Sequence, residues 1–271
     1  MLNVHTLGVL GFGNMGAAIV GGLCNRGVLT PKHVYVYDPS QERQETAAAL
    51  GAAICRNAAD VVSCAEAVLL AVKPQQMESA LQAARDGLTR STLFISIAAG
   101  ISTLWLERRI GPYARVIRAM PNTPALVEAS ATAICRGATA TDDDMTFARA
   151  LFEALGITVV VEESQMDAVT AVSGSGPAYF FRLVECLAEA GIKQGLPEDV
   201  AHSLAAQTLI GAGLLLQKSG ESPKTLRERV TSKGGTTEAA LRYFSENGFC
   251  FLVQGAVQAA AQRAAELALP T

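Results

Sequence analysis

Charged residues are scarce in this sequence: Asp, Glu, Lys and Arg make up 17% of its 271 residues, and the formal net charge is −3. No cluster of basic residues occurs, so nucleic acid is not expected as a partner. The six cysteines form no C-x-x-C pair, and the three histidines cluster with none of them. This spacing argues against a disulfide framework and predicts that no metal is bound. Scattered, reduced thiols are typical of a cytoplasmic protein.

Long hydrophobic runs are also missing. The longest apolar stretches, such as residues 204–216, contain Gln207 and Thr208 and are too short to span a bilayer, so no membrane association is expected. Residues 1–20 already have the pattern of a strand and a helix, which leaves no room for a targeting signal. Half of all residues are nevertheless hydrophobic, and the mean hydropathy of +0.27 is high for a soluble monomer. We expect the surplus apolar surface to lie in a subunit interface.

A glycine-rich turn dominates the N-terminal part of the chain. Gly11, Gly13 and Gly16 form a G-x-G-x-x-G pattern between a short apolar run and a helical pattern of small residues. In a Rossmann unit these positions allow the turn, the approach of a pyrophosphate and close helix packing, respectively. A second strand-like run, residues 34–37, ends in Asp38, where such a unit holds the adenosine ribose. The pattern predicts a dinucleotide site, with an empty doubly wound sheet as the alternative.

The order of the patterns predicts two domains. Residues 1–163 alternate short β-branched runs with helical patterns, which is typical of a Rossmann-type, mostly parallel, doubly wound α/β sheet. Three predicted strands end in turns marked by Gly or Pro, at 71–74, 98–100 and 120–122, and this edge of an open sheet forms the ligand crevice. Residues 164–271 have only helical patterns, so we predict an all-α domain for substrate binding and dimerisation.

The helical half contains helices that are apolar on more than one face. In residues 204–216 the apolar side chains cannot all point the same way at 3.6 residues per turn, and a helix that is apolar all round must be buried. A bundle of this size cannot bury several such helices by itself. We therefore expect two subunits to interlock their helical domains, with a compact intramolecular bundle packed on the sheet as the alternative.

Two glycine-rich segments in the helical half, residues 173–179 and 231–238, each lead into a predicted helix. In the second, the backbone N–H groups of residues 235–237 lie at a helix start beside hydroxyl groups and Lys233. This arrangement suits a small carboxylate, whereas the alternative is ordinary N-capping by Thr236. With a dinucleotide site in the same chain, and no Cys or His set for a nucleophile, hydride transfer to a small molecule is the simplest chemistry.

Six motifs, spread over nearly the whole chain, carry a family resemblance. Four of them are Gly11-Phe12-Gly13-Asn14-Met15-Gly16, Ala71-Val72-Lys73-Pro74, Ser96-Ile97-Ala98-Ala99-Gly100 and Arg118-Ala119-Met120-Pro121-Asn122-Thr123-Pro124. The other two are the segments 173–179 and 232–237. In order and spacing they resemble the motifs of pyrroline-5-carboxylate reductase over nearly the whole chain. The resemblance implies reduction of the C=N bond of 1-pyrroline-5-carboxylate to L-proline, the last step of proline biosynthesis, by hydride transfer from NADPH or NADH. It also implies an interlocked homodimer, in which the substrate loop of one subunit serves the cofactor domain of its neighbour.

The resemblance also assigns site residues. The cofactor would be lined by Leu10, Gly11, Phe12, Gly13, Asn14, Met15, Asp38, Asn57, Ala71, Val72, Lys73, Pro74, Ile97, Ala98 and Ala99, to which the crevice position adds Met120, Pro121 and Asn122. The substrate would be held by Ser232, Gly234, Gly235, Thr236 and Thr237. Thr237 matches the family's catalytic threonine, whose hydroxyl lies near the ring nitrogen and can relay a proton.

The choice between the two cofactors is open in the sequence. The family commonly favours NADPH, yet Asp38 is the residue type that binds a free ribose 2′-OH and repels a 2′-phosphate. Arg43 and Arg56 could offset this by pairing with the phosphate, so dual use is expected.

Two other functions are compatible with part of this pattern. A β-hydroxyacid dehydrogenase-like enzyme shares the two-half architecture but needs a lysine on the helix after its second glycine motif, and residues 177–185 contain none. A nucleotide-sensing dimer without turnover is the alternative from a different class.

Overall fold

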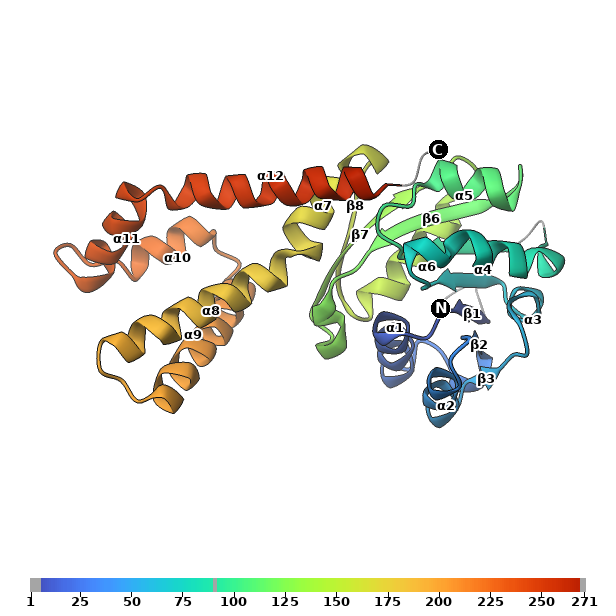
Figure 1. The fold of residues 1–271 in the computed structure, drawn as a ribbon, viewed down its shortest axis with the longest axis horizontal. Coiled ribbons are helices and arrows are strands. Elements are labelled where there is room, and N and C mark those ends of the chain that lie inside the picture. Colours follow the sequence, from blue (N-terminus) through green and yellow to red (C-terminus); the bar gives the residue numbers. More distant parts are fainter. Residues whose placement is uncertain (1–5, 90–91, 269–271) are drawn as a thin grey trace. The chain divides into compact units, whose positions relative to one another are not determined.

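The computed structural model describes residues 6–89 and 92–268 of the chain (Figure 1). Its contacts divide the chain into two compact units. The first comprises Met1–Ser175 together with Ala260–Thr271, and the second comprises Gly176–Ala259. The helical unit is therefore inserted into the first unit, because the chain leaves after Ser175 and returns at Ala260. The sequence-based boundary after residue 163 lies before this division, since residues 164–175 cluster with the sheet.

The first unit is built on one eight-stranded sheet, counted over the described residues, in the order β3-β2-β1-β4-β5-β6-β7-β8. All neighbouring strands are parallel except β6 and β7, which are antiparallel, so the sheet is mostly parallel as predicted. The strands are β1 (Leu7–Leu10), β2 (Val34–Tyr37), β3 (Ala53–Ile54), β4 (Ala67–Leu70), β5 (Leu93–Ser96), β6 (Arg115–Met120), β7 (Ser130–Arg136) and β8 (Gly156–Val160).

Helices cover both faces of this sheet. The bounds are α1 (Asn14–Asn25), α2 (Gln41–Ala49), α3 (Ala58–Cys64), α4 (Met77–Ala84), α5 (Thr103–Ile110), α6 (Asp142–Glu153) and α7 (Met166–Val169). Alternate strand residues enter two separate cores: Val9 packs with side chains of α1 and α6, whereas Leu10 packs with side chains of α3, α4 and α5. This alternation produces the doubly wound arrangement expected from the sequence.

The register of the parallel strands brings their carboxyl ends to one edge. Leu10 is paired with both Tyr37 and Leu70, and Leu70 is paired in turn with Ser96. Ser96 is paired with Arg118 of β6. The segments that follow these strands therefore open on the same side of the sheet, which is where open α/β sheets bind ligands.

A partly buried ion pair anchors the chain beyond β8. Nη1 of Arg118, a residue of β6 that is only 6% exposed, lies 2.6 Å from Oε1 of Glu163. The other carboxylate oxygen of Glu163 accepts hydrogen bonds from the N–H and the hydroxyl of Thr103, at the start of α5. The segment after β8 is joined in this way to α5 and β6, which lie more than 40 residues earlier in the sequence.

One helical segment was not predicted from the sequence. Residues 173 and 174 were expected in a glycine-rich loop, but they end a π-helix, Thr170–Gly174, that directly follows α7. The Ser175 N–H donates to the Thr170 carbonyl, five residues back, at 2.8 Å. π-Helical turns inside longer helices occur frequently at functional sites.

The second unit contains α8 (Gly176–Lys193), α9 (Glu198–Ser219), α10 (Pro223–Arg229), α11 (Thr236–Glu246) and the first part of α12 (Phe249–Leu267). Of α9, only Ala201 and Ala205 are buried. Large apolar side chains are exposed, including Leu204 at 55% and Phe251 at 80%. By length and composition alone, α9 could cross a membrane. The unit by itself leaves a large apolar surface without cover.

Candidate cofactor and substrate sites

Two of the three glycines in the turn have no room for a side chain, and the third faces open space. Gly11 has φ +89°, and a Cβ there would lie 2.8 Å from the Ala71 carbonyl oxygen. A Cβ at Gly16 would lie 2.7 Å from the Gly11 carbonyl oxygen. No atom lies within 4 Å of a Cβ built at Gly13. The middle glycine thus faces free space, which fits the approach of a cofactor pyrophosphate to the backbone.

Backbone donors converge on the same space at the start of α1. Gly13 is the N-cap and has no side-chain capping bond, and the first intrahelical bond runs from the Ala17 N–H to the Gly13 carbonyl. The N–H groups of residues 14–16 have no partner within the helix, as at every helix start. Together with the helix dipole they form an anion site of the kind that holds a dinucleotide pyrophosphate.

Asp38 contacts this turn directly. Its Oδ2 accepts a hydrogen bond from the Phe12 N–H at 2.7 Å, and its Oδ1 accepts from the Ser40 N–H at 2.9 Å. The side chains of Leu10 and Phe12 are buried in the two cores, so any contact of these residues with a cofactor would be made by their backbone atoms. Of the predicted cofactor residues 10–15, Gly13, Asn14 and Met15 are at least partly open to solvent, and Asp38 is partly exposed as well.

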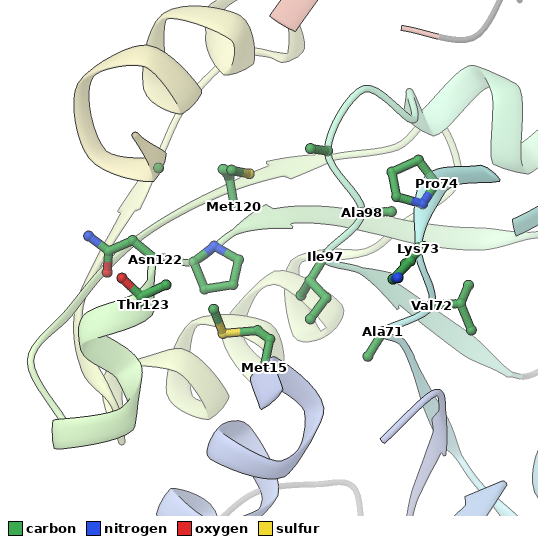
Figure 2. Close-up of a pocket in the computed structure, with 13 residues that line it drawn as sticks. Met15, Ala71, Val72, Lys73, Pro74, Ile97, Ala98, Met120, Asn122 and Thr123 are labelled. Atoms are coloured by element: carbon green, nitrogen blue, oxygen red, sulfur yellow. The ribbon is translucent and has the colours of Figure 1, made fainter. Parts of the chain in front are cut away.

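A cavity of about 320 Å³ lies at the carboxyl ends of β4, β5 and β6 (Figure 2). Its lining is Met15, Ala71, Val72, Lys73, Pro74, Ile97, Ala98, Ala99, Met120, Pro121, Asn122, Thr123 and Gly174. Every predicted cofactor residue of the segments 71–74, 97–99 and 120–122 is therefore brought to one cavity. Thr123 and Gly174 were not predicted as site residues, although both lie in motifs that the sequence analysis singled out.

The lining of the cavity is mostly apolar. Met15, from the start of α1, and Met120, from the end of β6, come from opposite sides (Figure 2). Lys73 is the one ionisable residue in the lining and is exposed. An apolar cavity next to an anion site has the shape and chemistry for a nicotinamide ring whose pyrophosphate lies on α1.

Asn122 and Asn57 both use their side chains within the protein. Nδ2 of Asn122 donates to the carbonyl oxygen of Ser173 at 3.1 Å, and its Oδ1 accepts from the N–H of Ala131. Asn57 is the N-cap of α3, with its Oδ1 accepting from the Asp60 N–H at 2.8 Å. Asn57 is exposed and is not among the residues that line the cavity.

The predicted substrate residues lie in the helical unit, at the start of α11. Gly234 has φ +74°, and its N–H donates to Oε2 of Glu238 at 2.7 Å. The Gly235 N–H donates to the Ser232 carbonyl oxygen at 3.0 Å, so this donor, expected to be available to a carboxylate, closes the turn instead. Ser232 and Thr236 are exposed, whereas Thr237 is half-buried.

The capping alternative for this segment is wrong. The N-cap of α11 is Gly235, without any side-chain capping bond, and Thr236 is the first residue inside the helix. The N–H groups of residues 236 and 237 belong to the first helical turn, where no intrahelical acceptor exists. They therefore remain suited to an anion.

Comparison with known proteins gives consistent results for both halves. A family described as pyrroline-5-carboxylate reductase dimerisation matches residues 163–267, and one described as NADP oxidoreductase coenzyme F420-dependent matches residues 6–100. The chain is 42% identical over 269 residues to pyrroline-5-carboxylate reductase of Pseudomonas aeruginosa, with 98% of both chains covered. It is 37% identical over 263 residues to that of Pisum sativum, covering 97% of this chain and 96% of the relative.

Two solved structures are also similar over their whole length. A pyrroline-5-carboxylate reductase from Coxiella burnetii has a TM-score of 0.93 and 34% identity, with 99% of this chain and 100% of that chain covered. The Plasmodium falciparum pyrroline carboxylate reductase, solved with NADP bound, has a TM-score of 0.87 and 30% identity at the same coverage. The match extends through both the sheet unit and the helical unit.

Proposed function

Because this chain belongs to the pyrroline-5-carboxylate reductase family, we propose that it reduces the C=N bond of 1-pyrroline-5-carboxylate to L-proline, the last step of proline biosynthesis. It is an oxidoreductase whose sheet unit is an NAD(P)-binding domain. The observation that carries this function is the presence of both halves of a reductase site in one chain. The first is the cavity beside the glycine turn, and the second is the turn of residues 232–237 at the start of α11.

The residues of the chain bind and orient the cofactor and the substrate, and the cofactor supplies the reactivity. When bound, reduced nicotinamide supplies the hydride that the imine carbon accepts. The first turn of α1 would hold the pyrophosphate, and the segments 71–74, 97–99 and 120–122 would line the site of the nicotinamide ring. The N–H groups of residues 236 and 237 hold the substrate carboxylate. The hydroxyl of Thr237 would orient the ring nitrogen and relay a proton to it, receiving one from solvent in the same step.

Both NADPH and NADH are proposed as donors. NADP is bound by the Plasmodium falciparum relative, which supports use of the phosphorylated form. The carboxylate of Asp38 favours a free ribose hydroxyl. Arg56, whose side chain is 88% exposed, and Arg43, which is half-buried at the start of α2, offer cations to a 2′-phosphate.

The active form is proposed to be an assembly of interlocked homodimers, in which the 232–237 turn of one subunit serves the cofactor domain of the other. The family match to a dimerisation region and the exposed apolar side chains of α9 and α12 support this. In this proposal the partner subunit covers α9, so that no membrane is needed. All six cysteines are free thiols, which supports a cytoplasmic location.

The test is cofactor oxidation by the purified full-length protein, with each reduced cofactor in turn. Oxidation that requires added 1-pyrroline-5-carboxylate and yields proline is expected. Turnover of a β-hydroxyacid with no effect of the pyrroline acid would favour a dehydrogenase instead. Cofactor binding without turnover of either substrate would favour the nucleotide-sensing dimer.

A further inference from the structure

The side chain of Asn122 is buried at the end of the strand that borders the cavity, and both of its polar atoms are bonded to protein. Nδ2 donates to the Ser173 carbonyl oxygen at 3.1 Å. Oδ1 accepts from the Ala131 N–H at 3.0 Å and from the Ser130 hydroxyl at 3.1 Å. Asn122 is only 8% exposed. Its amide therefore links the segments that contain Ser173 and Ala131, and it is not presented to a ligand.

The Ser173 carbonyl has a specific need for this donor. In a regular helix it would accept from the residue four positions on, but that residue is Pro177, which has no N–H. Ser173 is partly buried, and a carbonyl that is shielded from water and has no donor loses the free energy of a hydrogen bond. Asn122, 51 positions earlier in the chain, supplies the missing donor at the end of the π-helix Thr170–Gly174.

The hydrogen bond between Asn122 and Ser173 affects the cavity through Gly174, the residue after Ser173. Gly174 follows Ser173 and lines the cavity together with Met120. A Cβ at Gly174 would lie 2.7 Å from Cε of Met120, so the π-helix and the end of β6 are in close contact there. The bond from Asn122 to Ser173 thus fixes the separation of two walls of the cavity.

We propose that Asn122 is a positioning residue for the reduction, acting through Ser173 to hold the Gly174 wall of the cavity against the Met120 wall. This role rests on the proposed function, since it concerns the width of the space for the reacting rings. Asn122 does not touch the reactants with its amide. A misplacement of about 1 Å at a reacting centre costs on the order of 100-fold in rate, which sets the scale of the expected effect.

The test uses Asn122→Asp in the full-length protein. This change keeps the shape and the acceptor for Ala131, but it removes the Nδ2 donor and sets an oxygen against the Ser173 carbonyl. We expect kcat to fall about 10- to 100-fold, and the isotope effect on kcat with C4-deuterated NADPH to rise, because hydride transfer becomes more rate-limiting. Amide hydrogen exchange in residues 170–175 should become faster, whereas the Kd for NADP⁺ should change far less than kcat.

Asn247→Asp is the matched control. Asn247 donates through Nδ2 to the Tyr243 carbonyl oxygen at 2.8 Å, so the same kind of bond is lost, but at the exposed end of α11. The isotope effect and the exchange of residues 170–175 should both stay at their wild-type values in this variant. A folded Asn122→Asp enzyme with wild-type kcat and isotope effect would overturn the proposal. The proposal would also be overturned if Asn122→Asp lost only stability and kept an unchanged kcat per folded subunit.

Gly174→Ala addresses the same wall without altering Asn122. The new Cβ forces Met120 or the π-helix to move, so kcat should fall and the isotope effect should rise as in Asn122→Asp. If Asn122→Asp does not fold, unchanged kinetics in Gly174→Ala would overturn the proposal. Failure of the wild-type protein to turn over 1-pyrroline-5-carboxylate would instead refute the proposed function, and hydrogen exchange of residues 170–175 could still be compared.

Discussion

Asp38 and Phe12 are joined by a hydrogen bond, in which the Phe12 N–H donates to Oδ2 of the carboxylate at 2.7 Å. The bond fastens the end of β2 to the glycine turn, at the position where a Rossmann unit holds the ribose. A carboxylate oxygen has two lone pairs, so the same group can accept from the backbone and from a ribose hydroxyl. Asp38 therefore has a structural role, and we expect it also to affect the choice of cofactor.

Asp38→Ser is expected to raise the ratio of kcat/KM for NADPH to that for NADH, by roughly tenfold, because a charge that repels the 2′-phosphate is removed. The absolute kcat/KM should fall with both cofactors, since the Phe12 N–H loses its partner. Initial rates with each cofactor measure both effects. Asp38→Asn removes the charge and keeps one acceptor, so it should shift the ratio similarly with a smaller loss of absolute kcat/KM. An unchanged ratio in both variants would contradict the role of the Asp38 charge.

Thr237→Ala is expected to lower kcat/KM by roughly one to three powers of ten without unfolding the protein, because the hydroxyl proposed to orient the ring nitrogen is lost. Steady-state kinetics with 1-pyrroline-5-carboxylate and a circular dichroism melt provide the measurement. Thr237→Ser, which keeps the hydroxyl, should recover most of the activity. Wild-type kinetics in Thr237→Ala would refute the assignment.

Arg118→Met is expected to lower the free energy of unfolding by about 2 kcal/mol or more, because the carboxylate of Glu163 loses its buried partner. The measurement is urea denaturation at fixed protein concentration. The control is Arg149→Met, which breaks the exposed pair of Arg149 and Glu153 and should change the free energy by less than about 1 kcal/mol. Equal effects in the two variants would show that burial of Arg118 adds nothing.

The cysteines of the sheet unit are expected to differ in reactivity. Burial, together with the nearby carboxylate of Glu163, raises the pKa of Cys135 to about 12, and burial raises the pKa of Cys55 to about 11. Since the thiolate is the nucleophile, both stay protonated and unreactive at pH 8.5, whereas Cys64 is exposed. Iodoacetamide labelling followed by peptide mass spectrometry should modify Cys64 in the folded protein, and the other two only in urea.

The raised pKa of Cys135 also links stability to pH. The unfolded thiol ionises near its ordinary value of 9.0, and the folded thiol stays protonated until about 12. Between these values the unfolded state binds fewer protons, so the free energy of unfolding falls as the pH rises. Labelling of Cys135 in the folded protein near pH 9 would contradict this pKa.

Leu215→Arg is expected to shift the protein toward a monomer of 28.3 kDa, because a charge then replaces one of the exposed apolar side chains of α9. Sedimentation velocity at micromolar concentration measures the shift, and the wild-type protein should sediment as a dimer or a larger assembly. An exposed charge reversal in the sheet unit, Glu42→Lys, should leave the assembly unchanged. A wild-type protein that sediments as a monomer would refute the proposed interlocked dimer.

The fold and much of the cavity lining could be predicted because they depend on local patterns. Gly11 has a positive φ and Gly16 packs on the Gly11 carbonyl, five residues earlier, so their spacing alone marks a turn, and the strands before Ala71, Ile97 and Pro121 end in recognisable turns. Parallel strands align their carboxyl ends whatever their order in the sheet. The sequence alone therefore brings these segments to one edge.

The contacts that could not be predicted join residues far apart in the chain. Nothing local to Asn122 indicates that its amide is bonded to Ser173, and the same holds for Asp38 and Phe12. The S-G-S-G segment has the composition of a loop, and only the packed structure shows that its first two residues, Ser173 and Gly174, end a π-helix. Gly174 was missed as a cavity residue for this reason.

The inserted topology of the helical unit has a consequence for shortened forms of the protein. A Cβ at Gly100 would lie 2.9 Å from the Leu267 carbonyl oxygen, so the last turn of α12 lies directly on the loop after β5. A fragment that ends at residue 259 would uncover this loop beside the cavity wall formed by residues 97–99. Truncation from the C-terminus should therefore damage the nucleotide-binding half before it removes the helices that follow Ser175.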